Sequence, residues 1–249
     1  VVNLREEIIR LGGEIRFSNK LIGIDAPSGE IKAAEVQDVL SGKSYVLETE
    51  KLVLAIGHSA RDTFRYAQEL GIEMSAKPFS IGVRIEHPQE MVDEAQYGKT
   101  KGLPPAEYKL SHRCKNGRGV YTFCMCPGGE VIMSSSQEGG VVTNGMSNHS
   151  RDSGTANSGL LVDVRVSDFD VDDALAGVEF QEKYERLAYK NGGGRYAFPK
   201  TCWAEFRDGD EGAKAVIDSL PDFAVESIRE AMPHLGRKLK GFDADNAVM

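Results

Sequence analysis

The feature that most constrains this fold is a series of closely spaced extended segments in the middle of the chain. Connections rich in Gly, Pro, Asn and Ser separate these segments, and few of the connections could hold a helix. Parallel strands need a crossover of a dozen or more residues, usually helical, so this spacing predicts a mostly antiparallel sheet. The candidate strands are residues 79–86, 107–113, 119–125, 130–134, 141–145 and 160–166.

Helical patterns flank this middle region. Near the N-terminus, Leu4, Ile8, Ile9 and Leu11 share one face of a helix that Gly12-Gly13 would end. Ser59 and Asp62 have the spacing of a capping box at the start of a second helix. The sequence therefore predicts an α+β fold, in which a mostly antiparallel sheet domain has flanking helices. Further helices are expected over residues 59–70, 87–96, 170–190 and 222–231, the last of them ending before Pro233.

The N-terminal third contains a continuous apolar run at residues 51–56, which Gly57 ends. A run without polar alternation is typical of a strand buried on both faces. A helix pattern follows directly, so the segment has the order strand, glycine turn, helix. Shorter extended stretches are expected before it, at residues 14–17, 21–25, 31–39 and 44–48.

Charge and composition exclude several classes of function. Acidic residues outnumber basic ones by 38 to 30, which gives a net charge of −8 and disfavours binding to phosphate backbones. No stretch approaches 18 apolar residues, and the N-terminus has no signal-peptide pattern. Four cysteines are ordinary for a reduced compartment. We expect a cytoplasmic protein with a small-molecule substrate and neither a nucleic-acid nor a membrane partner.

Phosphate-binding glycine motifs are missing. No G-x-G-x-x-G follows a candidate strand, and the triple glycine at residues 192–194 follows a helix instead. Gly42-Lys43-Ser44 resembles the end of a P-loop, but Gln37 stands where that loop needs its first glycine. A complete dinucleotide site is therefore not expected in this chain.

Two cysteines, Cys124 and Cys126, have strand spacing, which predicts that both thiols point to one face. Three interpretations are open: structural thiols, a redox or substrate-facing pair, or zinc ligands together with His112 and Cys114. Since C-x-x-C is the usual redox spacing and this set is not a common zinc pattern, no metal site is predicted.

Other candidate polar groups lie at the ends of predicted elements. His58 follows the glycine turn, where a helix N-terminus would present free N–H groups to an anion or an electron-rich ring. An ordinary strand-to-helix turn is the alternative. Arg84 lies near the end of the strand predicted at residues 79–86, just before His87. The alternative to a functional role for Arg84 is an ion pair with Glu86 on the solvated face. The polar loop at residues 144–152 is either exposed and variable or functional.

Several long segments together resemble the FAD-dependent dehydrogenase family, whose members are often called NAD(FAD)-utilising dehydrogenases. The similarity extends over essentially the whole chain, with the motifs in the family's order. The segments are KLVLAIGHSARDTF (51–64), AKPFSIGVRIEHPQ (76–89), LPPAEYKLSHR (103–113), GVYTFCMCPGG (119–129) and VVTNGMS (141–147).

The resemblance implies a two-dinucleotide-binding flavoprotein core with a substrate domain inserted in it. Residues 1–76 would be a partial FAD-binding domain, residues 77–241 the inserted domain, and residues 242–249 the start of the return to the FAD domain. Ile56, Gly57 and His58 would then approach the cofactor.

The same resemblance supplies candidate site residues without establishing their roles. The catalytic candidates are His58, Arg61, Arg84, His87, Cys124 and Cys126. The substrate-binding candidates are Asn144, Met146, Ser147 and Arg151.

The function implied is hydride transfer between flavin and a small substrate or NAD(P)H. FAD would belong to the full-length protein, and we expect this piece to hold none without the remainder of its own FAD domain. One alternative is a cofactor-free binding or RNA-modification accessory module derived from the same fold. Another is a dithiol relay through Cys124 and Cys126 to the flavin.

Overall fold

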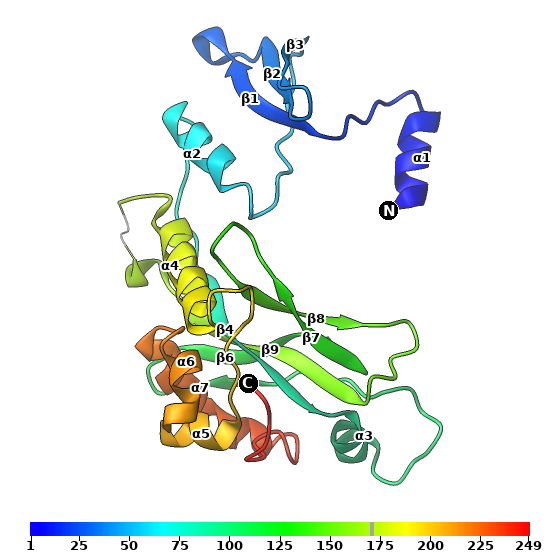
Figure 1. Ribbon diagram of the computed structural model, residues 1–249, viewed down its shortest axis with the longest axis vertical. Helices are drawn as coiled ribbons and strands as arrows, with labels where there is room; N and C mark the ends of the chain where they lie inside the picture. The colour runs from blue at the N-terminus through cyan, green and yellow to red at the C-terminus, as the bar shows by residue number, and fades with distance from the viewer. Residues whose placement is uncertain (170–171) are drawn as a thin grey trace. The chain divides into compact units, whose positions relative to one another are not determined.

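The computed structural model describes residues 1–169 and 172–249 and has an α+β fold with antiparallel sheets. The predicted fold class is confirmed to that extent. Contacts divide the chain into two units, residues 1–57 and residues 58–249, and each is described by itself below. Figure 1 labels most of the helices and strands of both units.

The first unit contains helix α1 (Val2–Arg10) and a three-stranded antiparallel sheet in the order β1-β2-β3. Its strands are β1 (Asn19–Asp25), β2 (Ala33–Asp38) and β3 (Ser44–Glu48), with a 3-10 turn at Pro27–Gly29. The central strand β2 buries Ala33, Ala34 and Val36. Helix α1 forms as predicted, but none of its residues is buried.

Residues 51–56 do not form the predicted strand. They lie outside any strand, with Val53 86% exposed and Leu54 41% exposed. A β-strand exists only where a neighbouring strand accepts and donates its backbone hydrogen bonds, and no described segment pairs with this run. The strand predicted at residues 14–17 is wrong for the same reason.

The second unit is organised by strand β9 (Thr155–Val164), which lies second in a four-stranded antiparallel sheet of order β4-β9-β6-β5. Its partners are β4 (Phe79–Pro88) and β6 (Gly119–Cys126), and β5 (Ser111–Arg113) forms the far edge. A separate hairpin joins β7 (Gly129–Ser134) to β8 (Val142–Ser147). The predicted antiparallel pairing is confirmed.

Helix α7 (Asp222–Gly236) packs against β5, β6 and β9. Ile228, Ala231, Met232 and Leu235 follow the i, i+3, i+4, i+7 pattern and are fully buried, so this face of the helix forms much of the core. The other helices of this unit are α2 (Arg61–Glu69), α3 (Gln89–Tyr97), α4 (Ala176–Asn191), α5 (Trp203–Asp208) and α6 (Lys214–Ile217). Two 3-10 turns lie at Val166–Asp168 and Glu211–Ala213.

Several predicted helix ends are wrong. The residue before α2 is Ala60 and makes no side-chain cap, so Ser59 and Asp62 do not form a capping box. Helix α7 continues through Pro233, because the buried residues on both sides of the proline outweigh one missing hydrogen bond. The predicted start of α4 at Asp170 lies outside the described residues, and the helix itself begins at Ala176.

The last residues of the chain pack into the second unit. Phe242 is fully buried, and Val248 forms antiparallel bridges with Glu86 and Cys202. The bridge to Glu86 connects the C-terminus to strand β4, and the bridge to Cys202 connects it to the residue before Trp203. No helix in the described part of the chain is long and apolar enough to cross a membrane.

A buried ion pair connects α2 to α4. The Arg61 side chain is 3% exposed and donates two hydrogen bonds to the Glu185 carboxylate, at 3.0 and 2.7 Å. Arg65, whose side chain is half exposed, pairs with Glu182 on the same helix at 2.8 Å. The two ion pairs therefore join the same helices but differ in how deeply the arginine is buried.

We expect Arg61→Ala to lower the free energy of unfolding by about 3 kcal/mol, because the buried Glu185 would lose its partner. Arg65→Ala is the matched control, and its loss should stay below about 1 kcal/mol, because Arg65 is half exposed and Glu182 keeps Arg61 and Arg186 at 3.8 and 3.4 Å. Urea denaturation of both variants measures the difference. Equal losses would show that the buried pair does not hold these helices together.

His87 belongs to the core of this unit. Its side chain is 2% exposed, and its Nε2 lies 2.8 Å from the Phe242 carbonyl oxygen, which identifies Nε2–H as the donor. The imidazole also packs against the Phe242 ring, with centroids 4.8 Å apart. Burial lowers the pKa of His87, since the charged form would lose its hydration.

The lowered pKa of His87 predicts that stability falls as the pH drops below about 6.5, where the unfolded chain binds a proton that the folded chain excludes. The loss is at most about 1.4 kcal/mol per pH unit and ends below the folded-state pKa. His87→Gln keeps an N–H donor but does not titrate. Urea denaturation at pH 7.5 and 5.5 should show a smaller pH effect in the variant, and an unchanged effect would contradict this origin.

Candidate functional site

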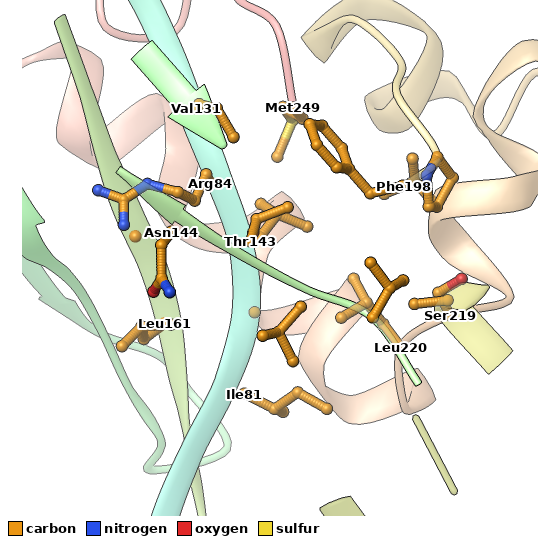
Figure 2. Close-up of a pocket in the computed structure, with 18 of the residues that line it drawn as sticks. Ile81, Arg84, Val131, Thr143, Asn144, Leu161, Phe198, Ser219, Leu220 and Met249 are labelled. Atoms are coloured by element: carbon orange, nitrogen blue, oxygen red, sulfur yellow. The ribbon is translucent and has the colours of Figure 1, made fainter. Parts of the chain in front are cut away.

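A cavity of about 720 Å³ lies within the second unit. One side is formed by β4 and the β7-β8 hairpin, and the other by α4, α6 and the segment around Phe198. Figure 2 shows Phe198, Leu220 and Met249 in its wall. Much of the lining is apolar and includes Phe79, Ile81, Val83, Val131, Val141, Leu161, Phe198, Val216, Leu220 and Met249.

Arg84 is a half-buried cation in the lining of this cavity. Its Nε donates to Asn157 Oδ1 at 2.8 Å, and its Nη2 donates to the Cys124 carbonyl oxygen at 2.7 Å. Cys126 Sγ lies 3.7 Å from the same Nη2. No described carboxylate forms an ion pair with Arg84, so the alternative of a pair with Glu86 does not hold. Burial lowers the pKa of Arg84 because the guanidinium loses hydration there.

Asn157 fixes one end of the Arg84 side chain. It is fully buried on β9, and accepting the bond from Arg84 identifies the amide orientation. Its Nδ2 is buried and has no hydrogen-bond partner among the described residues. An unpaired buried donor costs about 1–3 kcal/mol, so the structure keeps an unfavourable group beside the cation.

Gly145 on β8 leaves the space that this pair occupies. A Cβ at Gly145 would lie 2.3 Å from Arg84 Nη2 and 2.4 Å from Asn157 Oδ1. Both distances are far below van der Waals contact, so any side chain at this position would displace the guanidinium. The glycine therefore helps to determine where the cation lies.

The other charged groups in the lining differ in their contacts. Glu185 forms an ion pair with Arg61. Lys200 Nζ lies 5.0 Å from the centroid of the Phe198 ring. Glu86 and Glu130 add two carboxylates to the lining, and neither is in an ion pair with a described residue. Arg84 differs from Glu185 because it forms no ion pair with any described residue.

Four of the predicted site residues line this cavity: His58, Arg84, Cys124 and Asn144. His58 is exposed, with its Nε2 3.4 Å from Ser59 Oγ and 3.3 Å from Ser136 Oγ. Ile56 and Gly57 belong to the first unit.

The remaining candidates make other contacts. Arg61 and His87 lie in the buried contacts described above. Met146 is 59% exposed, and Ser147 Oγ donates to the Pro127 carbonyl at 2.8 Å. Arg151 pairs with Glu107 at 3.1 Å and is largely exposed. These residues keep their predicted roles only as proposals.

Cys124 and Cys126 do not share a strand face in the way their spacing predicts. A β-bulge interrupts the pairing of β6 with β9 between Phe123 and Cys126, and Cys124 has a φ of +45°. The extra residue disturbs the alternation of side chains. Cys124 is exposed and Cys126 is partly buried, and both are free thiols.

Sequence reasoning missed two residues of this site, Asn157 and Gly145. Asn157 precedes the strand that the sequence predicts at residues 160–166, whereas β9 begins at Thr155, so its place beside Arg84 was not expected. Nothing in the sequence indicated the role of Gly145, because that role depends on how closely Arg84 of β4 and Asn157 of β9 approach β8.

The described residues do not form a cradle for the FAD pyrophosphate. All described strand pairs are antiparallel, so the parallel unit that carries a dinucleotide site is not among them. Helix α2, which follows Gly57, has Asp62 in its first turn, and the Thr63 N–H donates to that carboxylate at 2.9 Å. A negative charge there disfavours a phosphate at this helix N-terminus.

Two comparisons with known proteins bear on the family. A family model described as "FAD-dependent protein, C-terminal domain-like" matches residues 78–249. A protein of Clostridium beijerinckii (strain ATCC 51743 / NCIMB 8052), which carries the name "Uncharacterized protein", is 42% identical over 268 aligned positions. The alignment covers 100% of this chain and 49% of that relative, so the chain spans about half of the relative's length. The chain belongs to the FAD-dependent protein, C-terminal domain-like family.

Proposed function

We propose that this chain is the substrate-binding part of a FAD-dependent oxidoreductase, a dehydrogenase that transfers hydride between flavin and a small substrate or NAD(P)H. The substrate would have an apolar body and a carboxylate or similar anionic group. The observation that carries this proposal is the large, mainly apolar cavity with one half-buried guanidinium that forms no ion pair with a described carboxylate.

The chemistry of Arg84 supports an anionic ligand. Removing a guanidinium from water is unfavourable unless an opposite charge or several hydrogen bonds replace its hydration. Its hydrogen bonds to the described residues use Nε and Nη2. Nη1 is therefore the group that a ligand oxygen would engage, and a carboxylate is the acceptor that suits a guanidinium best.

The apolar wall of the cavity supports the other proposed feature of the substrate, its apolar body. Phe198, Leu220 and Met249 lie in the cavity wall and would pack against a hydrocarbon or aromatic body (Figure 2). A substrate bound against these residues would displace water from them, which strengthens electrostatic contacts beside them. Arg84 would thus orient the substrate by one end, while the apolar wall holds the other.

FAD, when bound in the whole protein, supplies the hydride chemistry. This chain would bind and orient the substrate beside it. His58 lines the cavity, and histidine is the side chain that most often transfers protons in enzymes, so it is the candidate acid or base. Asn144 offers an amide to the same cavity.

A cofactor-free binding module, including an RNA-modification accessory protein, is the alternative. The antiparallel sheets are compatible with this alternative. So is the start of α2, where the Asp62 carboxylate accepts a hydrogen bond from the Thr63 N–H. Oxidised flavin absorption in the purified full-length protein supports the oxidoreductase, and its absence in protein made with ample riboflavin supports the module.

We expect Arg84→Gln in the full-length protein to weaken binding of carboxylates at least tenfold, since their anionic group would lose its counter-charge. The measurement is titration of the flavin spectrum with aliphatic and aromatic carboxylates and with the corresponding uncharged amides. Binding of the amides should change little.

Two further variants make this test specific. Arg207→Gln removes another guanidinium, which is exposed and paired with Asp208 and Asp245, and should leave carboxylate binding unchanged. Gly145→Ala keeps Arg84 but displaces its guanidinium, and should weaken binding in the same direction. An equal or larger effect of Arg207→Gln would show that Arg84 does not bind the anionic group, and if no carboxylate binds, the proposed substrate class is wrong.

The four free thiols allow a test of the dithiol relay. We expect iodoacetamide to label Cys124 fastest, because it is exposed, and Cys114 slowest, because it is 4% exposed. Labelling should not change after treatment with NADH or NADPH, since neither Cys124 nor Cys126 is in a disulfide. Mass spectrometry of the labelled full-length protein measures both results. A gain of two labelled thiols after reduction, at Cys124 and Cys126, would establish the relay instead.

A further inference from the structure

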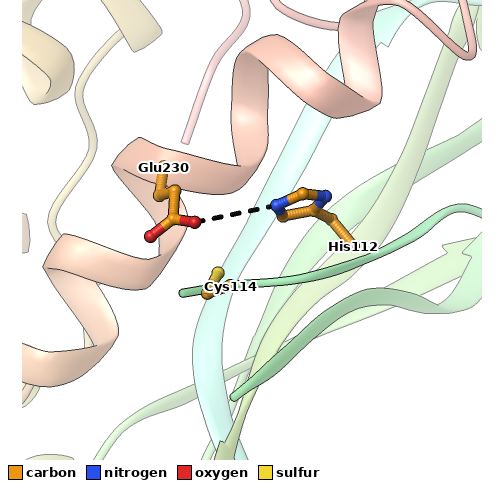
Figure 3. A group of neighbouring side chains, drawn as sticks. All are labelled: His112, Cys114 and Glu230. Atoms are coloured by element: carbon orange, nitrogen blue, oxygen red, sulfur yellow. Dashed lines mark ion pairs between the residues drawn. The ribbon is translucent and has the colours of Figure 1, made fainter. Parts of the chain in front are cut away.

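Three side chains with metal-binding atoms meet where the end of β5 faces helix α7. They are His112, Cys114 and Glu230, and Figure 3 shows their side chains grouped between the two elements. One ligand atom from each lies within 4.8 Å of the others, and His112 Nε2 is 3.8 Å from Glu230 Oε1. Neither Cys124 nor Cys126 belongs to this cluster.

The backbone fixes the two residues from the strand. His112 lies on β5, and Cys114 follows two residues later, so their side chains leave the chain on the same side. Cys114 begins the turn into β6: its N–H bonds the Arg118 carbonyl at 2.8 Å, and its carbonyl accepts from the Gly117 N–H at 2.9 Å. The turn therefore holds Cys114 in place without using its thiol.

The helix residue is held in the same way. The Lys115 N–H donates to Glu230 Oε1 at 2.9 Å, and Asn116 Nδ2 donates to Ser227 Oγ at 3.0 Å. These bonds join the β5-β6 turn to α7. The three ligand atoms are thus brought together by contacts that do not depend on a metal.

We propose that His112, Cys114 and Glu230 bind a divalent transition-metal ion, and that Zn²⁺ suits them best. Zinc accepts thiolate sulfur, imidazole nitrogen and carboxylate oxygen at about 2.0–2.3 Å in a tetrahedral arrangement. The ligand atoms must then approach one another by about 1 Å, which small side-chain rotations can supply. Ca²⁺ and Mg²⁺ prefer oxygen ligands, so a thiol and an imidazole select against them.

Burial and charge agree with this site. Cys114 is 4% exposed, while the His112 and Glu230 side chains are 18% and 27% exposed. The ion would therefore bind above a buried sulfur and keep one side open for a water molecule as its fourth ligand. The Cys114 thiol donates a weak hydrogen bond from Sγ to the Ser227 carbonyl at 3.4 Å, which a metal can replace.

His234 completes the surroundings as a positioning residue. It lies one helical turn beyond Glu230, and its ring stacks on His112 with centroids 3.9 Å apart. The stack sets the plane of the His112 ring. Arg237 bonds His234, and Lys238 bonds the Ser111 carbonyl, so cations surround the cluster. A bound cation therefore needs both the Cys114 thiolate and the Glu230 carboxylate to offset this charge.

The test uses the full-length protein after removal of metal with a chelator. Zn²⁺ is titrated against a competing chromophoric chelator, and Co²⁺ is added in a parallel experiment to report on thiolate ligation. We expect one zinc ion at this site, a thiolate-to-cobalt charge-transfer absorption, and a higher Tm with zinc. Cys114→Ser should weaken zinc binding roughly 100-fold and abolish the thiolate band.

Further variants separate metal ligation from folding and from other thiols. Glu230→Gln should weaken zinc binding roughly tenfold at nearly unchanged size. Cys202→Ser makes the same substitution at a partly buried thiol outside the cluster and should leave the zinc affinity unchanged. If Cys114→Ser fails to fold, Glu230→Gln and His112→Asn still decide the question.

Three results would overturn the proposal. They are no zinc binding by the wild-type protein, equal affinities in the Cys114→Ser and Cys202→Ser variants, and a thiolate band that depends on Cys124 or Cys126. None of the measurements requires enzymatic activity, so the outcome is independent of the proposed function.

Discussion

The pairing of β9 with both β4 and β6 is the constraint on which the candidate site depends. In this register Glu86 lies opposite Asn157, and Arg84 lies opposite Gly159, so the cation and its amide partner occupy adjacent strands. On the other side, Cys126 pairs with Asn157, and the bulge before it presents the Cys124 carbonyl to Arg84. A shift of one residue on either side would turn these side chains to the opposite face.

Local sequence patterns predicted the antiparallel sheet because the evidence for it is local. Short connections forbid parallel crossovers whatever the rest of the molecule does. The same reasoning failed at residues 51–56, where an apolar run identified a segment suited to a strand but said nothing about which neighbour would pair with it. The prediction that the helix ends before Pro233 was wrong for a related reason. It considered the proline alone and not the buried helix face around it.

The candidate site was harder to predict because its geometry comes from residues far apart in the chain. His87 and Arg84 lie on the same strand three residues apart, yet one is buried against Phe242 and the other lines the cavity. Periodicity gives the alternation of faces but not what covers each face. Asn157 and Gly145 matter only because β9 and β8 approach Arg84 together, and no spacing in the sequence encodes that approach.

The cavity and the His112, Cys114 and Glu230 cluster depend on different parts of the same strand. Cys124 and Cys126 lie at the end of β6, while the turn from Cys114 enters its beginning. An ion in the cluster would join this turn to α7. The buried face of α7 packs against β5, β6 and β9. Metal binding would therefore stabilise the sheet that positions Arg84 without contacting a substrate, so loss of metal should lower stability before it alters which ligand the cavity accepts.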